Sequence, residues 1–126
     1  MDLTNKVALV TGGGVRVGRA LTLGLAAAGA HVVVHYNRSS AAAEETAQLA
    51  RQLGVRAVVV QGDLADPAAT VSLARAGIDA FGGVDVLVHA ASPFVQGGLL
   101  VTDLVTWRHV MGVLVDAFFL LAREIT

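Results

Sequence analysis

The sequence contains no cysteine, two prolines and only 5% aromatic residues. The absence of cysteine excludes disulfide bonds and thiolate chemistry, so nothing ties the chain to an oxidising compartment and we expect a cytoplasmic protein. Neither sign of charge is in large excess: the formal net charge is −1, which argues against a nucleic-acid-binding surface. The histidines show no metal-ligand clustering, so we expect no metal site.

The apolar composition does not suggest a membrane span either. A long charge-free stretch, 20–37, is broken by glycines and histidines, and the chain opens with polar residues rather than a signal-peptide pattern. We therefore expect no membrane partner. The chain is nevertheless 55% hydrophobic, mostly through alanine, valine and leucine. That composition is typical of a parallel sheet whose strands are buried on both faces.

Apolar segments of two kinds alternate along the chain. The patterns predict strands at 6–11, 31–36, 55–61 and 85–89, and helices at 17–28, 41–53, 67–81 and from 106 to the end. Strict alternation of strands and helices predicts a single α/β domain over 1–126, a doubly wound parallel sheet of the Rossmann type. The fourth strand is as apolar as an interior strand, yet no further strand follows. We therefore expect a domain truncated after the fourth strand and fourth helix.

The apolar periodicity of the first helix predicts which face it buries. Its stripe consists of Val17, Ala20, Leu21, Gly24, Leu25 and Ala28. We expect this stripe to face the sheet, with Gly24 allowing close contact between helix and sheet.

A glycine loop, 11–18, separates the first strand from the first helix. Strand, glycine loop and helix together seat a phosphate on a helix N-terminus. Its glycines, Gly12, Gly14 and Gly18, are one residue too widely spaced for G-x-G-x-x-G. A strand-to-helix turn without a ligand therefore remains an alternative for this loop.

The residues after the second strand suggest which nucleotide binds. In a dinucleotide fold this point contacts the adenosine ribose, where a carboxylate would repel a 2′-phosphate. The chain has no acidic residue between Asp2 and Glu44, and 37–40 reads Asn-Arg-Ser-Ser. A guanidinium with hydroxyls suits a phosphate dianion, which favours NADP(H) over NAD(H). The alternative is a polar loop with a solvated arginine.

Three motifs together resemble the N-terminal half of a short-chain dehydrogenase/reductase: Thr11-Gly12 with Gly18, Gly62-Asp63-Leu64, and the segment 85–92. That family's glycine loop reads T-G-x-x-x-G-x-G, which accounts for the wide spacing here, and Arg16 stands where the middle glycine usually lies. Arg16 together with 35–39 resembles the NADPH-dependent pteridine reductase branch of the family.

The resemblance implies phosphate-binding roles at two places. Gly12, Arg16 and Val17 would line the pyrophosphate. Arg38 and Ser39 would hold the 2′-phosphate.

The resemblance also implies contacts to the bases and riboses. The Asp63 carboxylate would accept a hydrogen bond from the adenine amino group, with Leu64 beside the ring. Ala90, Ala91 and Ser92 would run along the ribose and nicotinamide. The alternatives are a turn-capping role for Asp63 and an ordinary loop hydroxyl for Ser92.

The catalytic residues of the family are missing. Its members use a tyrosine as general acid and a lysine four residues later that lowers the tyrosine pKa. This chain has one tyrosine, Tyr36, and one lysine, Lys6, which do not have that spacing. Where the family usually has asparagines, this chain has His89 and Ala90 after the fourth strand and Leu114 on the fourth helix. We interpret His89 as a core histidine with satisfied hydrogen bonds; the alternative is that it substitutes for an asparagine as a polar group.

We therefore expect an NADP(H)-binding oxidoreductase homologue that is inactive as this chain alone and contributes no catalytic residue. Full-length relatives would reduce carbonyls or pterins. The alternative is a non-catalytic nucleotide-binding or assembly module. The last helix has apolar residues on several sides, including Val113, Val115 and Phe119, so we also expect a homo-oligomer formed through this helix, or a complementing chain.

Overall fold

A computed structural model of the chain describes residues 2–93 and 95–126. Its sheet consists of β1 (Val7–Thr11), β2 (His31–Tyr36), β3 (Ala57–Gln61) and β4 (Val86–His89), in the order β3-β2-β1-β4. All three strand pairings are parallel. The strand order reverses between β1 and β4, as in other doubly wound sheets. The predicted fold class is confirmed.

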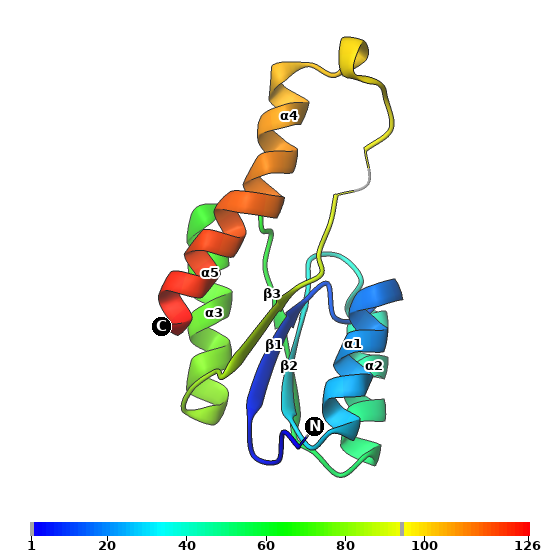
Figure 1. Cartoon of the computed structure of the whole chain (residues 1–126), viewed down its shortest axis with the longest axis vertical. Coiled ribbons are helices and arrows are strands. Elements are labelled where there is room, and N and C mark those ends of the chain that lie inside the picture. The colour runs from blue at the N-terminus through cyan, green and yellow to red at the C-terminus, as the bar shows by residue number, and fades with distance from the viewer. Residues whose placement is uncertain (1, 94) are drawn as a thin grey trace.

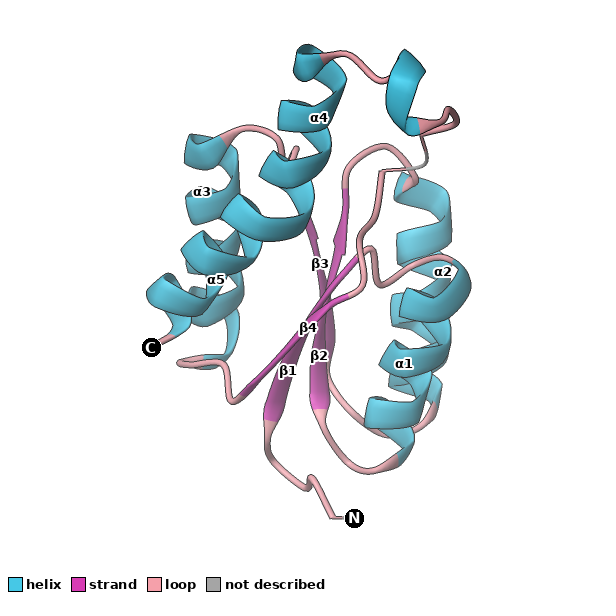
Figure 2. Cartoon of the chain, turned by 45° about the horizontal axis from the view of Figure 1, so that its top comes forward, coloured by secondary structure: helices cyan, strands magenta, loops and turns pink. Residues whose placement is uncertain are grey.

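Helices cover both faces of this sheet (Figure 1). α1 (Arg16–Ala27) and α2 (Ser40–Gln52) lie on one face, and α3 (Pro67–Phe81) and α5 (Ala117–Ile125) lie on the other. Between β4 and α5 the chain forms a short 3-10 helix, η1 (Leu99–Val101), then α4 (Leu104–Met111) and a π-helical segment, η2 (Gly112–Asp116). Figure 2 shows α4 projecting beyond the ends of the strands.

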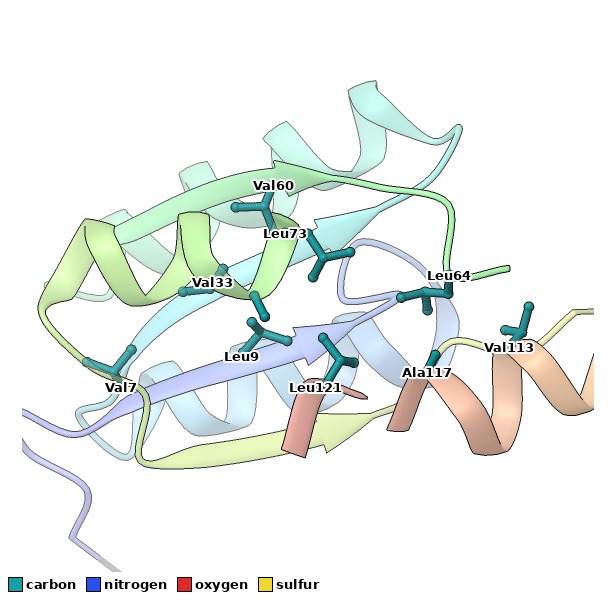
Figure 3. Close-up of a cluster of buried hydrophobic side chains, with 10 residues drawn as sticks. Val7, Leu9, Val33, Val60, Leu64, Leu73, Val113, Ala117 and Leu121 are labelled. Carbon is teal, nitrogen blue, oxygen red and sulfur yellow. The ribbon is translucent and has the colours of Figure 1, made fainter. Parts of the chain in front are cut away.

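The core on the α3 and α5 side is built from branched aliphatic side chains of the strands and helices (Figure 3). Leu9, Val33 and Leu121 are fully buried there. On the other face, the core is made largely of alanines from α1 and α2 against the valines of β2. Small residues let these helices approach the sheet closely. The two central strands, β1 and β2, are therefore buried on both faces, as the composition predicted, whereas β4 is only half-buried.

The predicted buried stripe of α1 is wrong. Gly24 is exposed, and a Cβ built there would contact nothing within 4 Å. The buried residues are Gly18, Thr22 and Ala26 instead. Thr22 behaves as a core residue because its hydroxyl donates to the carbonyl oxygens of the glycine loop and of its own helix.

α3 begins at residue 67, as predicted, and has a local N-cap. Asp66 is the N-cap residue, and its carboxylate accepts hydrogen bonds from the backbone N–H groups of Ala68 at 3.0 Å and Ala69 at 3.4 Å. Pro67 follows at the first helical position, where its missing N–H costs nothing. The cap therefore satisfies donors that the helix itself leaves without partners.

Replacing Asp66 with alanine is expected to lower the free energy of unfolding by about 1 kcal/mol, since the two N–H groups lose their acceptor. Urea unfolding monitored by circular dichroism measures the change. Asp66→Asn is the control, because an asparagine caps about as well as an aspartate. Equal losses for both variants would contradict the capping role.

The last helix begins earlier than predicted and is not uniform. It starts at Leu104, after an Asp103 cap, and passes through η2 before continuing as α5. Its buried face is made by Val113, Ala117 and Leu121, whereas Phe118 and Phe119 remain 48% and 58% exposed.

The stretch Leu104–Ile125 is also long and apolar enough to cross a membrane by length and composition, with 17% of its most apolar window buried. A core helix of a globular domain can meet the same criterion. Here the stretch packs part of one side into the core of the sheet domain.

Candidate nucleotide-binding cleft

A cavity of about 840 Å³ opens where the carboxyl ends of the strands meet the starts of the helices. This is where open α/β sheets bind their ligands. Each residue predicted to contact the cofactor lines this cavity: Gly12, Arg16, Val17, Arg38, Ser39, Asp63, Leu64, Ala90, Ala91 and Ser92. Segments far apart in the sequence are thus brought to one site. Their individual roles remain predictions.

The glycine loop is pressed against its neighbours on both sides. Gly12 has a φ of +60°, and a Cβ there would lie 2.9 Å from the Cα of Ala91. A Cβ on Gly14 would lie 2.7 Å from the backbone of Ala43 in α2, and one on Gly18 would overlap the carbonyl oxygen of Gly12. Glycine is therefore required at these positions by the packing of the loop itself.

The backbone N–H groups of this loop are divided into two sets. Those of Gly12 and Gly13 donate to the ring Nδ1 and the carbonyl oxygen of His35, at 3.0 and 3.1 Å. Those of Arg16, Val17 and Gly18 have no acceptor within the described part of the chain. These three belong to the first turn of α1, which holds no acidic residue. The free donors make the start of α1 electrostatically suited to an anion.

Arg16 adopts the left-handed region, with a φ of +48°. A non-glycine residue is strained there by roughly 1–2 kcal/mol. Its position is the one at which the sequence resemblance places a glycine. Glycine would adopt the same backbone conformation without strain, so the strained arginine is consistent with a role for its charge.

The second cationic position lies after β2. Arg38 is exposed, and its guanidinium makes no ion pair with the residues the structure describes. Ser39 is the N-cap residue of α2, but its hydroxyl makes no capping hydrogen bond. The neighbouring Asn37 is held by Gln61, whose Nε2 donates to its carbonyl oxygen at 3.2 Å. Arg38 and Ser39 thus present a guanidinium and a hydroxyl to the cavity.

Asp63 and Leu64 follow β3 and differ in exposure. One carboxylate oxygen of Asp63, Oδ1, accepts from the N–H of Ala65 at 2.9 Å, which is the turn-capping role considered as an alternative. Leu64 is only 5% exposed and forms part of the core. The cavity is therefore lined by the cations of Arg16 and Arg38 and the single carboxylate of Asp63. This balance favours an anionic ligand.

A chain of hydrogen bonds fixes the loop after β4. The N–H of Ala91 donates to Thr11 Oγ1 at 3.1 Å, and Thr11 Oγ1 lies 2.9 Å from His89 Nδ1. His89 Nε2 lies 2.8 Å from the carbonyl oxygen of Val113 in η2. Both ring nitrogens of His89 are therefore bonded, as predicted, although the side chain is half-buried rather than part of the core.

The structure also adds cavity residues that the sequence did not indicate as site residues. His35 is 2% exposed and sits beneath the glycine loop. His109 of α4 and Val113 of η2 also line the cavity. Only the tertiary placement of the long helix brings them there, so no local signal could have identified them.

Tyr36 and Lys6 do not form a catalytic pair. Tyr36 lines the cavity at the end of β2. Lys6 precedes β1, where its carbonyl oxygen accepts from the N–H of His31 at the opposite edge of the sheet. Among the described residues no group of three or more histidine or acidic side chains could hold a metal ion.

Comparisons with known proteins agree on one family. The short chain dehydrogenase model matches residues 6–126. The short-chain dehydrogenase/reductase homolog YusS of Bacillus subtilis is 40% identical over 92 residues, which are 73% of this chain and 84% of that protein. The L-rhamnose 1-dehydrogenase (NADP(+)) of Thermoplasma acidophilum is 33% identical over 99% of this chain and 49% of its own length.

The solved structures are similar over nearly the whole chain. A short chain dehydrogenase from Burkholderia cenocepacia, in complex with NADP, superimposes with a TM-score of 0.94 at 35% identity. The match covers 99% of this chain and 51% of that one, so the chain spans about half the length of this relative and of the rhamnose dehydrogenase. On sequence and structure together, this chain belongs to the short-chain dehydrogenase family.

Proposed function

We propose that this chain binds NADP(H) in the cleft and forms the cofactor-binding part of a short-chain oxidoreductase. The observation that carries the proposal is the set of free N–H donors at residues 16–18, which lies in one cavity with two guanidinium groups and a single carboxylate. Donors and cations in that arrangement suit a ligand with several phosphates. The NADP bound by the Burkholderia relative supports the same ligand.

The residues present fit this cofactor. The start of α1 would hold the pyrophosphate, Arg38 and Ser39 the 2′-phosphate, and the segment 90–92 would lie along the nicotinamide half. NADP(H), when bound, supplies hydride transfer. The chain's own part is to orient the cofactor and to neutralise its charge. Carbonyl or pterin reduction would be the reaction of a complete enzyme, and the pteridine reductase branch remains the narrower hypothesis.

Fluorescence titration with NADPH and NADH tests the proposal. We expect NADPH to bind more tightly than NADH, because the guanidinium of Arg38 gains a charge-assisted hydrogen bond only with the 2′-phosphate. Binding of neither nucleotide would contradict a nucleotide-binding function. Tighter binding of NADH would contradict the role given to Arg38 and Ser39.

We also expect no measurable reduction of carbonyl substrates by this chain alone. Tyr36 and Lys6 lie at opposite ends of the sheet, so they cannot act together as the tyrosine and lysine of a general-acid pair. A spectrophotometric assay of NADPH oxidation measures turnover. If the chain does turn over a substrate, and substitution of one of its residues abolishes that activity, the chain carries a catalytic residue and this prediction is wrong.

We propose that the exposed apolar surface of this chain is covered by another polypeptide. The long helix exposes Leu114, Val115, Phe118 and Phe119, and no other described strand pairs with the outer edge of β4. Exposed apolar side chains next to an open strand edge favour association. A second copy bound through the last helix, or a complementing chain, would cover this surface. Sedimentation of the purified chain distinguishes a self-associated form from a monomer.

A further inference from the structure

The side chain of His35 connects the two turns on either side of the cleft. Its Nδ1 accepts a hydrogen bond from the N–H of Gly12 at 3.0 Å, and its Nε2 lies 2.8 Å from the carbonyl oxygen of Gly62. Gly12 begins the glycine loop, and Gly62 begins the turn that carries Asp63. The imidazole therefore sets the separation of these two turns.

The hydrogen bonds also determine the protonation of the ring. Since the N–H of Gly12 is a donor, Nδ1 carries no hydrogen, and Nε2–H is then the donor to Gly62. His35 is accordingly neutral. Burial lowers the pKa of His35 below its ordinary value, the bond to Gly62 opposes this, and the nearby His89 lowers it further.

We propose that His35 is a positioning residue of the cofactor cleft, and that the cleft binds NADP(H) only while this imidazole is neutral. The inference rests on the proposed function. A proton on Nδ1 would face the N–H of Gly12, so two donors would oppose each other and the bond would be lost. The glycine loop would then lose the hydrogen bond that turns the N–H group of Gly12 inward.

The groups around His35 favour the neutral ring in the free protein. His89 of β4 contributes to lowering the pKa of His35. Arg16 and Arg38 line the same cavity, as do the single carboxylate of Asp63 and the phenol of Tyr36. Because bound cofactor would hold the glycine loop in its present shape, NADP⁺ binding and proton binding at His35 must oppose each other.

The ring nitrogens of the four histidines, followed by ¹⁵N NMR, provide the direct test. We expect His35 in the free chain to show an unprotonated Nδ1 and a protonated Nε2, and saturating NADP⁺ to shift its titration to lower pH. NADP⁺ binding at about pH 7.5 that leaves the His35 titration unchanged would overturn the inference while leaving the proposed function intact. No binding at that pH would contradict the proposed function itself.

Calorimetric titration with NADP⁺ across about pH 7.5 to 5 gives a second test. We expect the wild-type Kd to rise more steeply than that of His35→Asn as the pH falls, by at most about tenfold for each unit by which binding lowers the His35 pKa. Asparagine offers Gly12 an acceptor but does not titrate. The protonation of the 2′-phosphate affects both proteins alike and cancels in this comparison.

The matched control is His31→Asn, on the same strand. His31 Nδ1 accepts from the N–H of Arg56 at the far edge of the sheet, away from the cavity. This variant is expected to keep the wild-type pH dependence. Equal pH dependence in wild type and His35→Asn would overturn the inference. If His35→Asn does not fold, the NMR titration of the wild-type chain decides alone.

Discussion

Replacing Arg38 with glutamate is expected to weaken NADPH binding by about 1–3 kcal/mol, or roughly 5- to 150-fold. The guanidinium of Arg38 lines the cavity beside Ser39 and makes no ion pair with another described residue. Its charge is thus available to the 2′-phosphate. A glutamate there removes the charge-assisted hydrogen bonds and places a carboxylate next to the dianion. Titration of both proteins with NADPH, under identical salt conditions, measures the change.

Two comparisons separate this effect from a general loss of positive charge. Arg108→Glu makes the same charge change at an exposed position of α4 that does not line the cavity, and it should leave the affinity nearly unchanged. NADH lacks the 2′-phosphate, so Arg38→Glu should weaken NADH binding far less than NADPH binding. An unchanged NADPH affinity in Arg38→Glu would refute the assignment of this residue.

Replacing Gly18 with alanine is expected to destabilise the fold by about 3 kcal/mol or more. The added Cβ would overlap the carbonyl oxygen of Gly12, and it would approach the Cα of Gly13 to 3.2 Å. Both are backbone atoms of the glycine loop, so no side-chain rotation can relieve the clash. Urea unfolding, monitored by circular dichroism, measures the loss.

Gly24→Ala is the matched control, six residues further along the same helix. A Cβ at Gly24 has no neighbour within 4 Å. This variant should raise stability by about 0.5–1 kcal/mol, because alanine is the better helix former. Comparable effects of the two substitutions would show that the requirement for glycine at position 18 comes from something other than its contact with Gly12.

The sequence was sufficient to predict the fold because each element has a strong local pattern. The valines of β2 and the cap formed by Asp66 and Pro67 identify their elements without tertiary information. The predicted orientation of α1 failed for a physical reason. The prediction placed the most hydrophobic residues of α1 on its buried face. The close packing of α1 on this sheet instead places small residues there. Gly18, Thr22 and Ala26 are therefore buried, and the larger Val17 and Leu21 are exposed.

The cleft was predictable where its residues follow strand ends in sequence. The segments after β1, β2, β3 and β4 must meet at one edge of a parallel sheet, so Arg16, Arg38, Asp63 and Ala90 could be grouped in advance. The role of His35 could not be predicted, since it depends on hydrogen bonds to Gly12 and Gly62 that are distant in sequence.

The irregularity in the long helix also lacked a sequence signal. The residues of η2 read Gly-Val-Leu-Val-Asp, which fits an ordinary helix as well as a π-helical one. The carbonyl oxygen of Val113 in this segment accepts the hydrogen bond from His89. That partner lies on β4 and is known only once the helix is placed against the sheet.

We propose that NADP(H) occupies the cleft between the glycine loop and the segment 90–92. The most direct test is titration of the ¹⁵N-labelled chain with NADP⁺ while the backbone amide signals are followed. We predict the largest shifts at the free N–H groups of Arg16, Val17 and Gly18, with further shifts at Arg38 and in the segment 90–92. If saturating NADP⁺ leaves those amide signals unshifted, or shifts only signals at the opposite edge near Lys6, NADP(H) does not bind in this cleft.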